Sequence, residues 1–238
     1  EGIMIPPTKI YRKGKLNKEV LDLILHNCRL PHWNRADFNA LIAGLRTAER
    51  RCIEIAERFG VDIYIEAMEQ MLDRNKRAMS AIIKMVIPEK KAYFEDYICD
   101  DGIGTGPYKI ACSVERKGDV AYFDFTGTDP QSKSSINFYL NEEMFKMFLG
   151  AFTINIFDPQ ILFNDGFYDL VDVTIPAGTI LKPMKPAALS CRTHMLGRIF
   201  DIMGGLLGQG APDALNAAGF SDSPHFMYSG YDKNGEWY

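Results

Sequence analysis

The chain has 238 residues, of which 47% are hydrophobic and 24% charged, a composition typical of ordinary globular proteins and not of disordered or fibrous ones. The chain has 27 Lys and Arg residues and 31 Asp and Glu residues, so its formal charge is −4. Because it also has no long stretch of basic residues, nucleic acid is not expected as a partner. The longest apolar stretch, residues 144–157, is shorter than the roughly 20 residues of a membrane helix, so no membrane partner is expected. The five cysteines include no C-x-x-C pair, which predicts reduced thiols in a cytoplasmic protein.

The first 88 residues are expected to form one domain, residues 1–88, in which an extended lead-in precedes helices. Two adjacent prolines keep the lead-in out of a helical conformation. Apolar residues at three- and four-residue steps predict a short helix over residues 17–30, with Asn17 as its cap, and two long helices over residues 35–59 and 62–86.

Each long helix carries one apolar face, and the two faces are expected to pack together as a long antiparallel hairpin. Gly60 separates the helices and favours the left-handed conformation that often follows a helix end. The apolar positions are Phe38, Leu41, Leu45, Ala48, Cys52, Ile55 and Phe59 on the first helix and Ile65, Met68, Leu72, Met79, Ile82 and Met85 on the second.

Residues 89–238 are expected to form a second domain of strands and helices. Aromatic and β-branched residues predict strands over residues 93–98, 108–115 and 120–125, which a tight turn at residues 117–119 helps to join as an antiparallel meander. The remaining predicted elements are a helix over 141–152, a strand over 171–175, a turn at 176–178 and a helix over 193–207. The predicted fold class is therefore α+β, a helical hairpin followed by an antiparallel strand meander and mixed α/β segments.

A glycine-rich loop at residues 102–106 is similar to a phosphate-binding loop in composition alone. A P-loop continues with Lys-Ser or Lys-Thr and a helix, whereas Pro107 and a strand follow here, so a connecting loop is predicted. A neighbouring acidic group could bind a hard cation, although solvated side chains are the favoured interpretation. Its members are Glu95, Asp96, Asp100 and Asp101.

The richest candidate site is the segment from Ser190 to Arg198, where a loop meets a helix. The first N–H groups of a helix lack partners and attract anions, and the Arg192 guanidinium could bind carboxylate, bicarbonate or phosphate. The alternative is that Ser190 or Thr193 only caps the helix, while Arg192 and Arg198 are surface charges. Ser190, Arg192, Thr193 and His194 are therefore the candidate substrate-binding residues, and no catalytic residue or metal ligand is identified.

Several segments, taken in order along the chain, resemble the hydantoinase B family, which also includes the C-terminal half of ATP-dependent 5-oxoprolinase and one subunit of acetone and acetophenone carboxylases. The order is kept over essentially the whole chain, so the resemblance is more specific than any single motif. The matching segments are residues 1–7 (EGIMIPP), 45–51 (LRTAERR), 104–110 (GTGPYKI), 123–131 (FDFTGTDPQ), 164–166 (NDG) and 176–179 (PAGT).

One segment departs from the common pattern of that family. After Pro186 the family usually reads Gly-Gly-Asn-x-Glu-Thr, whereas residues 189–194 of this chain read LSCRTH. This difference and the segment at residues 138–143 (FYLNEE) are similar to the acetone and acetophenone carboxylase branch. The resemblance implies a biotin-independent ligase that uses ATP to carboxylate a ketone with bicarbonate, with ATP bound mainly on a hydantoinase A-like subunit of a hetero-oligomeric complex.

The resemblance also implies that the chain is an internal piece of a larger subunit. In relatives, a region rich in His and Asp that binds a divalent metal such as Mg, Mn or Zn lies upstream of the segment matching residues 1–7, so the metal ligands are expected outside this chain. The role then implied for Arg192 and His194 is to orient an anionic intermediate by charge-assisted hydrogen bonds.

Two alternatives stay open for the function. An ATP-dependent hydantoinase or 5-oxoprolinase subunit would hydrolyse a cyclic amide, and a non-catalytic scaffold region would only dock the subunits of such a complex. Ketone-dependent incorporation of labelled bicarbonate separates the carboxylase from the hydrolase, because the hydrolase needs only water.

Overall fold

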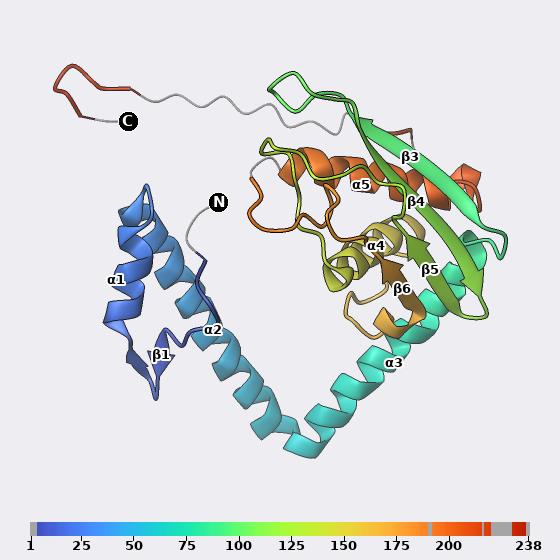
Figure 1. Ribbon diagram of the computed structural model, residues 1–238. Coiled ribbons are helices and arrows are strands. Elements are labelled where there is room, and N and C mark those ends of the chain that lie inside the picture. Colours follow the sequence, from blue (N-terminus) through green and yellow to red (C-terminus); the bar gives the residue numbers. More distant parts are fainter. Residues whose placement is uncertain (1–3, 190–191, 216, 220–229, 237–238) are drawn as a thin grey trace. The chain divides into compact units, whose positions relative to one another are not determined.

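The chain forms helices and strands in the expected α+β arrangement (Figure 1). It divides into two compact units, Glu1–Gln70 and Met71–Tyr238, and the division lies inside the second long helix. The expected division at residue 88 concerns domains of a larger subunit and stays a prediction. The computed structural model describes residues 4–189, 192–215, 217–219 and 230–236.

The elements follow the predicted order, with ends that differ by a few residues. The helices are α1 (Lys18–His26), α2 (Pro31–Phe59), α3 (Val61–Val86), α4 (Glu142–Phe157) and α5 (Arg192–Leu207), with 3-10 turns at Tyr168–Leu170 and Pro212–Ala214. The strands are β1 (Tyr11–Arg12), β2 (Lys15–Leu16), β3 (Ala92–Ile98), β4 (Tyr108–Lys117), β5 (Val120–Asp124) and β6 (Val171–Thr174).

The first unit is built from the short β1–β2 hairpin, α1, α2 and the beginning of α3. Leu21 and Leu25 of α1 are buried where α1 packs against α2. Asn17 precedes α1, as expected, but its side chain makes no capping hydrogen bond. Pro31 opens α2, in agreement with the preference of proline for the first helical position.

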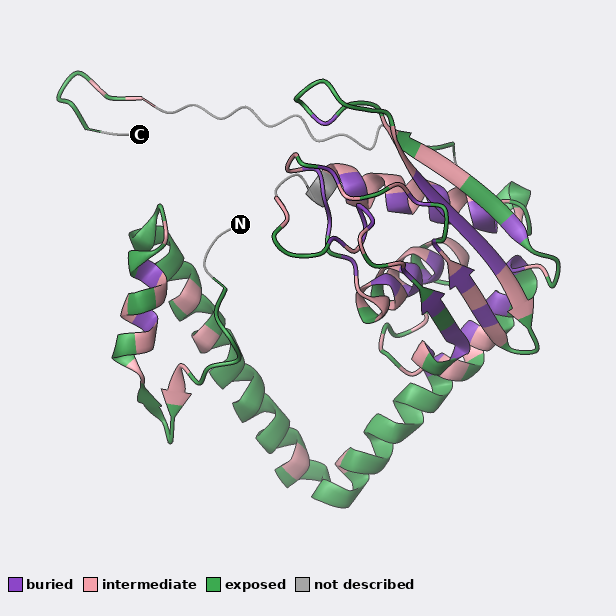
Figure 2. Ribbon diagram, in the orientation of Figure 1, coloured by how far each residue is buried: buried purple, intermediate pink, exposed green. Residues whose placement is uncertain are grey.

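The predicted packing of α2 against α3 as a hairpin with mutually buried faces stays a prediction, because α2 and most of α3 belong to different compact units. Both helices form, and Gly60 between them has the predicted positive φ, +92°, but its ψ of 145° differs from that of the left-handed helical conformation. However, α2 lies wholly within the described residues and has no buried residue; Leu41 and Leu45 are each 66% exposed (Figure 2). The spacing of apolar residues fixes the face that a helix offers, but it does not say which partner covers that face.

In α3 the apolar face is used only in its C-terminal half, which belongs to the second unit. Two close approaches fix this half: a Cβ at Gly166 would lie 2.1 Å from the Leu72 carbonyl oxygen, and one at Gly210 would lie 2.0 Å from that of Val86. Only glycine therefore fits where these two loops cross the helix. The buried residues of α3 are Asn75, Met79, Ile82, Ile83 and Val86.

The second unit contains a four-stranded sheet in the order β3-β4-β5-β6. The pairs β3–β4 and β4–β5 are antiparallel, which confirms the predicted meander, and β6 pairs with β5 in parallel. Phe94 pairs with Cys112, and Val114 pairs with Phe123, which in turn pairs with Val173. Because paired residues share a face, these apolar side chains line one side of the sheet.

Helices α4 and α5 cover that apolar side and close the core. α5 packs against β3 and β4, and α4 packs against β6. Phe145 of α4 is fully buried, and its ring makes edge contacts with Phe123 at 5.0 Å and Phe125 at 5.2 Å between ring centroids. Asn141 caps α4 by accepting a hydrogen bond from the Met144 N–H at 2.7 Å. No helix within residues 4–189 and 192–215 is both long and apolar enough to cross a membrane.

Candidate functional site

The predicted site lies at the beginning of α5, and only part of it can be described. The helix begins at Arg192, one residue before the predicted start. Ser190 lies outside the described residues, as do the side chains of Arg192 and Thr193, while His194 is half-buried. The predicted anion-binding role of these four residues therefore stays a prediction.

A partly buried ion pair fixes α5 to the sheet one turn after His194. Arg198 Nη1 donates to Asp96 Oδ2 of β3 at 2.8 Å, and each of the two side chains is 22% exposed. On the inner side of the helix, Met195 and Ile199 are fully buried. The interpretation of Arg198 as a surface charge is therefore wrong, because this guanidinium joins the helix that begins at the candidate site to the edge strand of the sheet.

The buried carboxylate of Asp101 joins the loop after β3 to the loop after β5. Its Oδ1 accepts the N–H groups of Ile103 at 3.1 Å and Thr105 at 3.0 Å. Its Oδ2 accepts the hydroxyls of Tyr108 at 3.0 Å and Ser132 at 3.1 Å. Burial acts to raise the pKa of Asp101, but the four hydrogen bonds lower it by more, so the pKa lies below its usual value.

The buried side chain of Asn137 extends this network to the segment that leads into α5. Its Oδ1 accepts the Ser132 N–H at 2.8 Å. Its Nδ2 lies within donor distance of three carbonyl oxygens, those of Ser132 at 2.8 Å, Ser134 at 3.0 Å and Ala188 at 3.0 Å. Because Ala188 lies two residues before Ser190, the amide joins the loop after β5 to the chain just before the candidate site.

The glycine-rich stretch is a connecting loop between β3 and β4, as predicted. Gly102 and Gly104 have φ values of +79° and +87°, a region that favours glycine. Asp100 accepts the Gly102 N–H at 2.6 Å, and the Asp101 N–H donates to the Thr105 carbonyl at 2.9 Å. The loop therefore serves to wrap the chain around the Asp101 carboxylate.

The acidic group at β3 is engaged with protein partners, and the interpretation of solvated side chains is wrong for Asp101, which is 4% exposed. Glu95 accepts hydroxyl hydrogen bonds from Tyr93 and from Tyr97, the latter at 2.7 Å. The bond to Glu95 raises the pKa of Tyr93 to about 12, because the neutral phenol is the better donor. Within the described part of the chain, no group of three or more His, Cys, Asp or Glu side chains could hold a metal ion.

No sequence motif points directly to the polar cluster of Asp101, Tyr108, Ser132 and Asn137. Asp101 and Ser132 are 31 residues apart, and no motif links them. The one available sign was the polar run at residues 131–137, which follows the third predicted strand and contains Ser, Lys and Asn. A buried role for such a run becomes visible only after the β3–β4 loop has folded over it.

The opposite end of α5 has a different character. A cavity of about 480 Å³ lies beside its last turns, and its walls are formed by aromatic, aliphatic and glycine residues. It is about 15 Å along the helix from His194, at 1.5 Å per residue. The lining includes Phe94, Phe152, Phe200, Gly204, Gly205 and Leu215.

Comparison with known proteins decides the family. The family model for Hydantoinase B/oxoprolinase matches residues 1–238, the entire length of the chain. The chain belongs to this family. The resemblance seen in the order of the sequence segments is thereby confirmed.

Among curated members of the hydantoinase B/oxoprolinase family, the beta subunit of caprolactamase from Pseudomonas jessenii is 30% identical over 220 residues. That match covers 92% of this chain but 37% of the relative, so the chain spans less than two fifths of the relative's length. The crystal structure of the ATP-dependent caprolactamase from the same organism superposes with a TM-score of 0.79, at 29% identity, over 90% of this chain and 37% of that one.

The family fold is also shared with acetone carboxylase. Its nucleotide-free structure superposes with a TM-score of 0.80 over 97% of this chain and 32% of that one. The sequences are 16% identical, so this likeness concerns the fold alone. One family fold therefore occurs in an enzyme named for a lactam and in another named for a ketone.

Proposed function

We propose that this chain is part of the hydantoinase B-type subunit of an ATP-dependent, multi-subunit enzyme that carboxylates a small ketone with bicarbonate, without biotin. Membership of the hydantoinase B/oxoprolinase family over residues 1–238 supports the subunit type. The observation that carries the reaction is the segment at residues 189–194, LSCRTH, which departs from the usual family pattern at the point where α5 begins. A loop that differs at a helix start is where a different anion would be bound.

The chemistry proposed for the start of α5 is the positioning of an anion. The N–H groups of the first turn of α5 and the Arg192 guanidinium would bind bicarbonate or the carboxylated intermediate by charge-assisted hydrogen bonds. His194 would donate a proton to the reacting species or accept one from it. Such donors accelerate a reaction where they stabilise charge that develops in the transition state.

The cofactors of the proposed reaction are assigned to the complex. ATP would bind mainly to a hydantoinase A-like partner subunit, where it activates the ketone or bicarbonate. A divalent metal such as Mg, Mn or Zn would be held by ligands outside these 238 residues, as the family resemblance implies. No step on this chain is therefore assigned to the metal.

A second candidate function is the ATP-dependent hydrolysis of a cyclic amide. The caprolactamase beta subunit favours it, because its 30% identity exceeds the 16% identity of acetone carboxylase. Both reactions include an attack on a carbonyl carbon and a developing oxyanion. The same donors at the start of α5 could therefore stabilise the oxyanion in either reaction.

The test is performed on the complete complex with ATP. Ketone-dependent incorporation of labelled bicarbonate, measured with acetone and with acetophenone, is the result expected for the carboxylase. Ring opening of caprolactam, hydantoin or 5-oxoproline without bicarbonate would replace the carboxylase proposal with the hydrolase.

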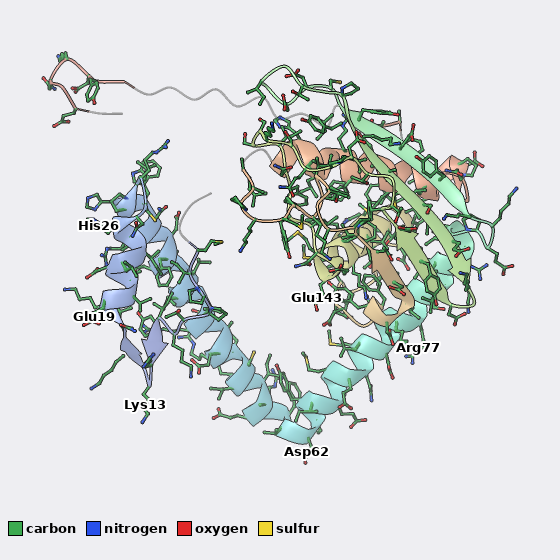
Figure 3. The ribbon with its side chains drawn as sticks, in the orientation of Figure 1. Lys13, Glu19, His26, Asp62, Arg77 and Glu143 are labelled. Carbon is green, nitrogen blue, oxygen red and sulfur yellow. The ribbon has the colours of Figure 1, made fainter. Side chains whose placement is uncertain are left out.

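The proposed role of the site is tested by Arg192→Ala and His194→Ala in the same complex. Loss of one donor to a developing anion costs roughly 10²-fold in kcat, so each variant should lose about that much. Arg77→Ala, on the exposed side of α3, is the matched control and should retain full activity (Figure 3). Turnover within a few-fold of the unmodified enzyme, with the complex intact, would instead favour a scaffold role for this region.

A further inference from the structure

The approach to α5 is held by one side chain from a distant part of the sequence. Asn137 is 1% exposed, and its amide Nδ2 lies 3.0 Å from the carbonyl oxygen of Ala188, 51 residues further along the chain. The next residue, Leu189, forms isolated bridges with both Ile136 and Asn137. Both backbone and side chain of the Asn137 region therefore contact the last two residues before Ser190.

The amide is itself held in one orientation. Its Oδ1 accepts the Ser132 N–H at 2.8 Å, and its Nδ2 lies 2.8 Å from the Ser132 carbonyl oxygen, so acceptor and donor are both used on the same residue. Flipping the amide would place a donor against the Ser132 N–H and an acceptor against its carbonyl. The side chain is thereby fixed so that its remaining donor capacity faces Ser134 and Ala188.

A second layer fixes the loop that carries Asn137. Ser132 donates its hydroxyl to the buried Asp101 carboxylate at 3.1 Å and accepts the Ser134 N–H at 2.9 Å. Asp101 is in turn surrounded by donors from the β3–β4 loop. A buried polar network that is fully satisfied holds a single geometry, because each alternative leaves a buried group without a partner.

We propose that Asn137 is a positioning residue that sets where α5, the helix that carries Arg192 and His194, begins. The proposal rests on the proposed function only in requiring that these two residues contact the reacting species, and it holds for ketone carboxylation and for cyclic-amide hydrolysis alike. Its physical basis is that a catalytic group displaced by about 1 Å can cost 10²-fold in rate. Asn137 acts through the backbone at Ala188 and Leu189, at a distance from the chemistry.

The first experiment compares two buried asparagines in the complete complex. Asn137→Asp keeps the shape but replaces the donor with a carboxylate that faces three carbonyl oxygens. Asn75→Asp is the matched control, since Asn75 is 2% exposed and donates to the Leu162 carbonyl at 2.9 Å beside α3. Both variants lose stability, but kcat/KM per folded enzyme should fall at least 10-fold for Asn137→Asp and stay within 2-fold for Asn75→Asp. Equal losses in the two variants would overturn the proposal.

A double-mutant cycle shows whether Asn137 acts through Arg192. In an Arg192→Ala background, Asn137→Asp should reduce kcat/KM by less than 3-fold, because the group that it positions is already gone. Independent losses that multiply would overturn the inference while leaving the proposed function in place. An Arg192→Ala enzyme of unchanged activity would remove the proposed role of Arg192 and this inference together.

Hydrogen exchange gives a readout that needs no substrate. Backbone amides of residues 188–196 should exchange at least 10-fold faster in Asn137→Asp than in the unmodified complex. In Asn75→Asp, the exchange rates of the same amides should be unchanged. Unchanged exchange in Asn137→Asp would overturn the proposal. If Asn137→Asp does not fold, Asn137→Ala, which adds no charge, is compared with Asn75→Ala under the same two expectations.

Discussion

Helices α2 and α5 have the same kind of apolar spacing, but the apolar side chains are exposed in α2 and buried in α5. In α5, Met195, Ile199 and Met203 are completely buried against the sheet. In α2, Leu41 and Leu45 are each 66% exposed, and no residue of this fully described helix is buried (Figure 2). An amphipathic pattern therefore specifies a helix and its apolar face, while the stability gained from that face depends on the partner that covers it.

The two apolar faces therefore contribute differently to the free energy of unfolding. Full burial of an aliphatic side chain contributes about 1.5–3 kcal/mol, so each buried residue of α5 contributes on this scale. An exposed leucine on α2 contributes little, since its surface stays in contact with water. Substitutions matched between the two helices therefore test the comparison directly.

The largest expected difference concerns apolar side chains. Ile199→Ala in α5 should lower the free energy of unfolding by about 2–5 kcal/mol, because it removes buried surface and leaves a cavity. Leu45→Ala in α2 should change it by less than about 0.5 kcal/mol. Denaturant unfolding followed by circular dichroism measures both. Comparable losses in the two variants would show that the apolar face of α2 is covered in solution.

Glycine-to-alanine substitutions in the two helices should change the stability in opposite directions. A Cβ at Gly205 of α5 would lie 2.5 Å from the ring of Phe94, so Gly205→Ala should destabilise the protein by about 1–3 kcal/mol. A Cβ at Gly44 of α2 would meet nothing within 4 Å, so Gly44→Ala should stabilise it by about 0.4–1 kcal/mol through lower chain entropy. Thermal unfolding of the two variants provides the measurement, and destabilisation by Gly44→Ala would contradict the open surface of α2.

The smallest expected effect is a pH dependence that belongs to the loop before β4. The folded pKa of Asp101 lies below its ordinary value of 3.8, so the unfolded state binds more protons in the acidic range. Its stabilising contribution is therefore present above about pH 4 and is lost as the pH falls through the folded pKa. Asp101→Asn should be less stable than the unmodified protein at pH 7, with a difference that shrinks below pH 4.

Asp37→Asn, on exposed α2, is the matched control for this pH dependence. It should track the unmodified protein across the same titration, because an exposed carboxylate without a fixed partner contributes little. Parallel unfolding curves of Asp101→Asn and the unmodified protein at every pH would show that the carboxylate of Asp101 has no special role.

Some site residues were accessible to sequence reasoning and others were not. The segment from Ser190 to His194 could be singled out because its hydroxyl, guanidinium and imidazole groups are adjacent in the chain. Asn137 and Asp101 could not, because their roles depend on partners at residues 188 and 132 that only folding brings near. Arg198 was likewise open to interpretation as a surface charge until the β3 strand placed Asp96 beside it.

The helices, the strand meander, the break at Gly60 and the family could all be predicted before folding was considered, because local spacing, glycine positions and the order of short segments carry that information. Which apolar faces are buried, and which polar groups meet just before α5, became clear only from the folded chain. Burial and hydrogen bonding each need two groups in contact. The contribution of a helix face or a carboxylate to stability therefore depends on the group that lies against it.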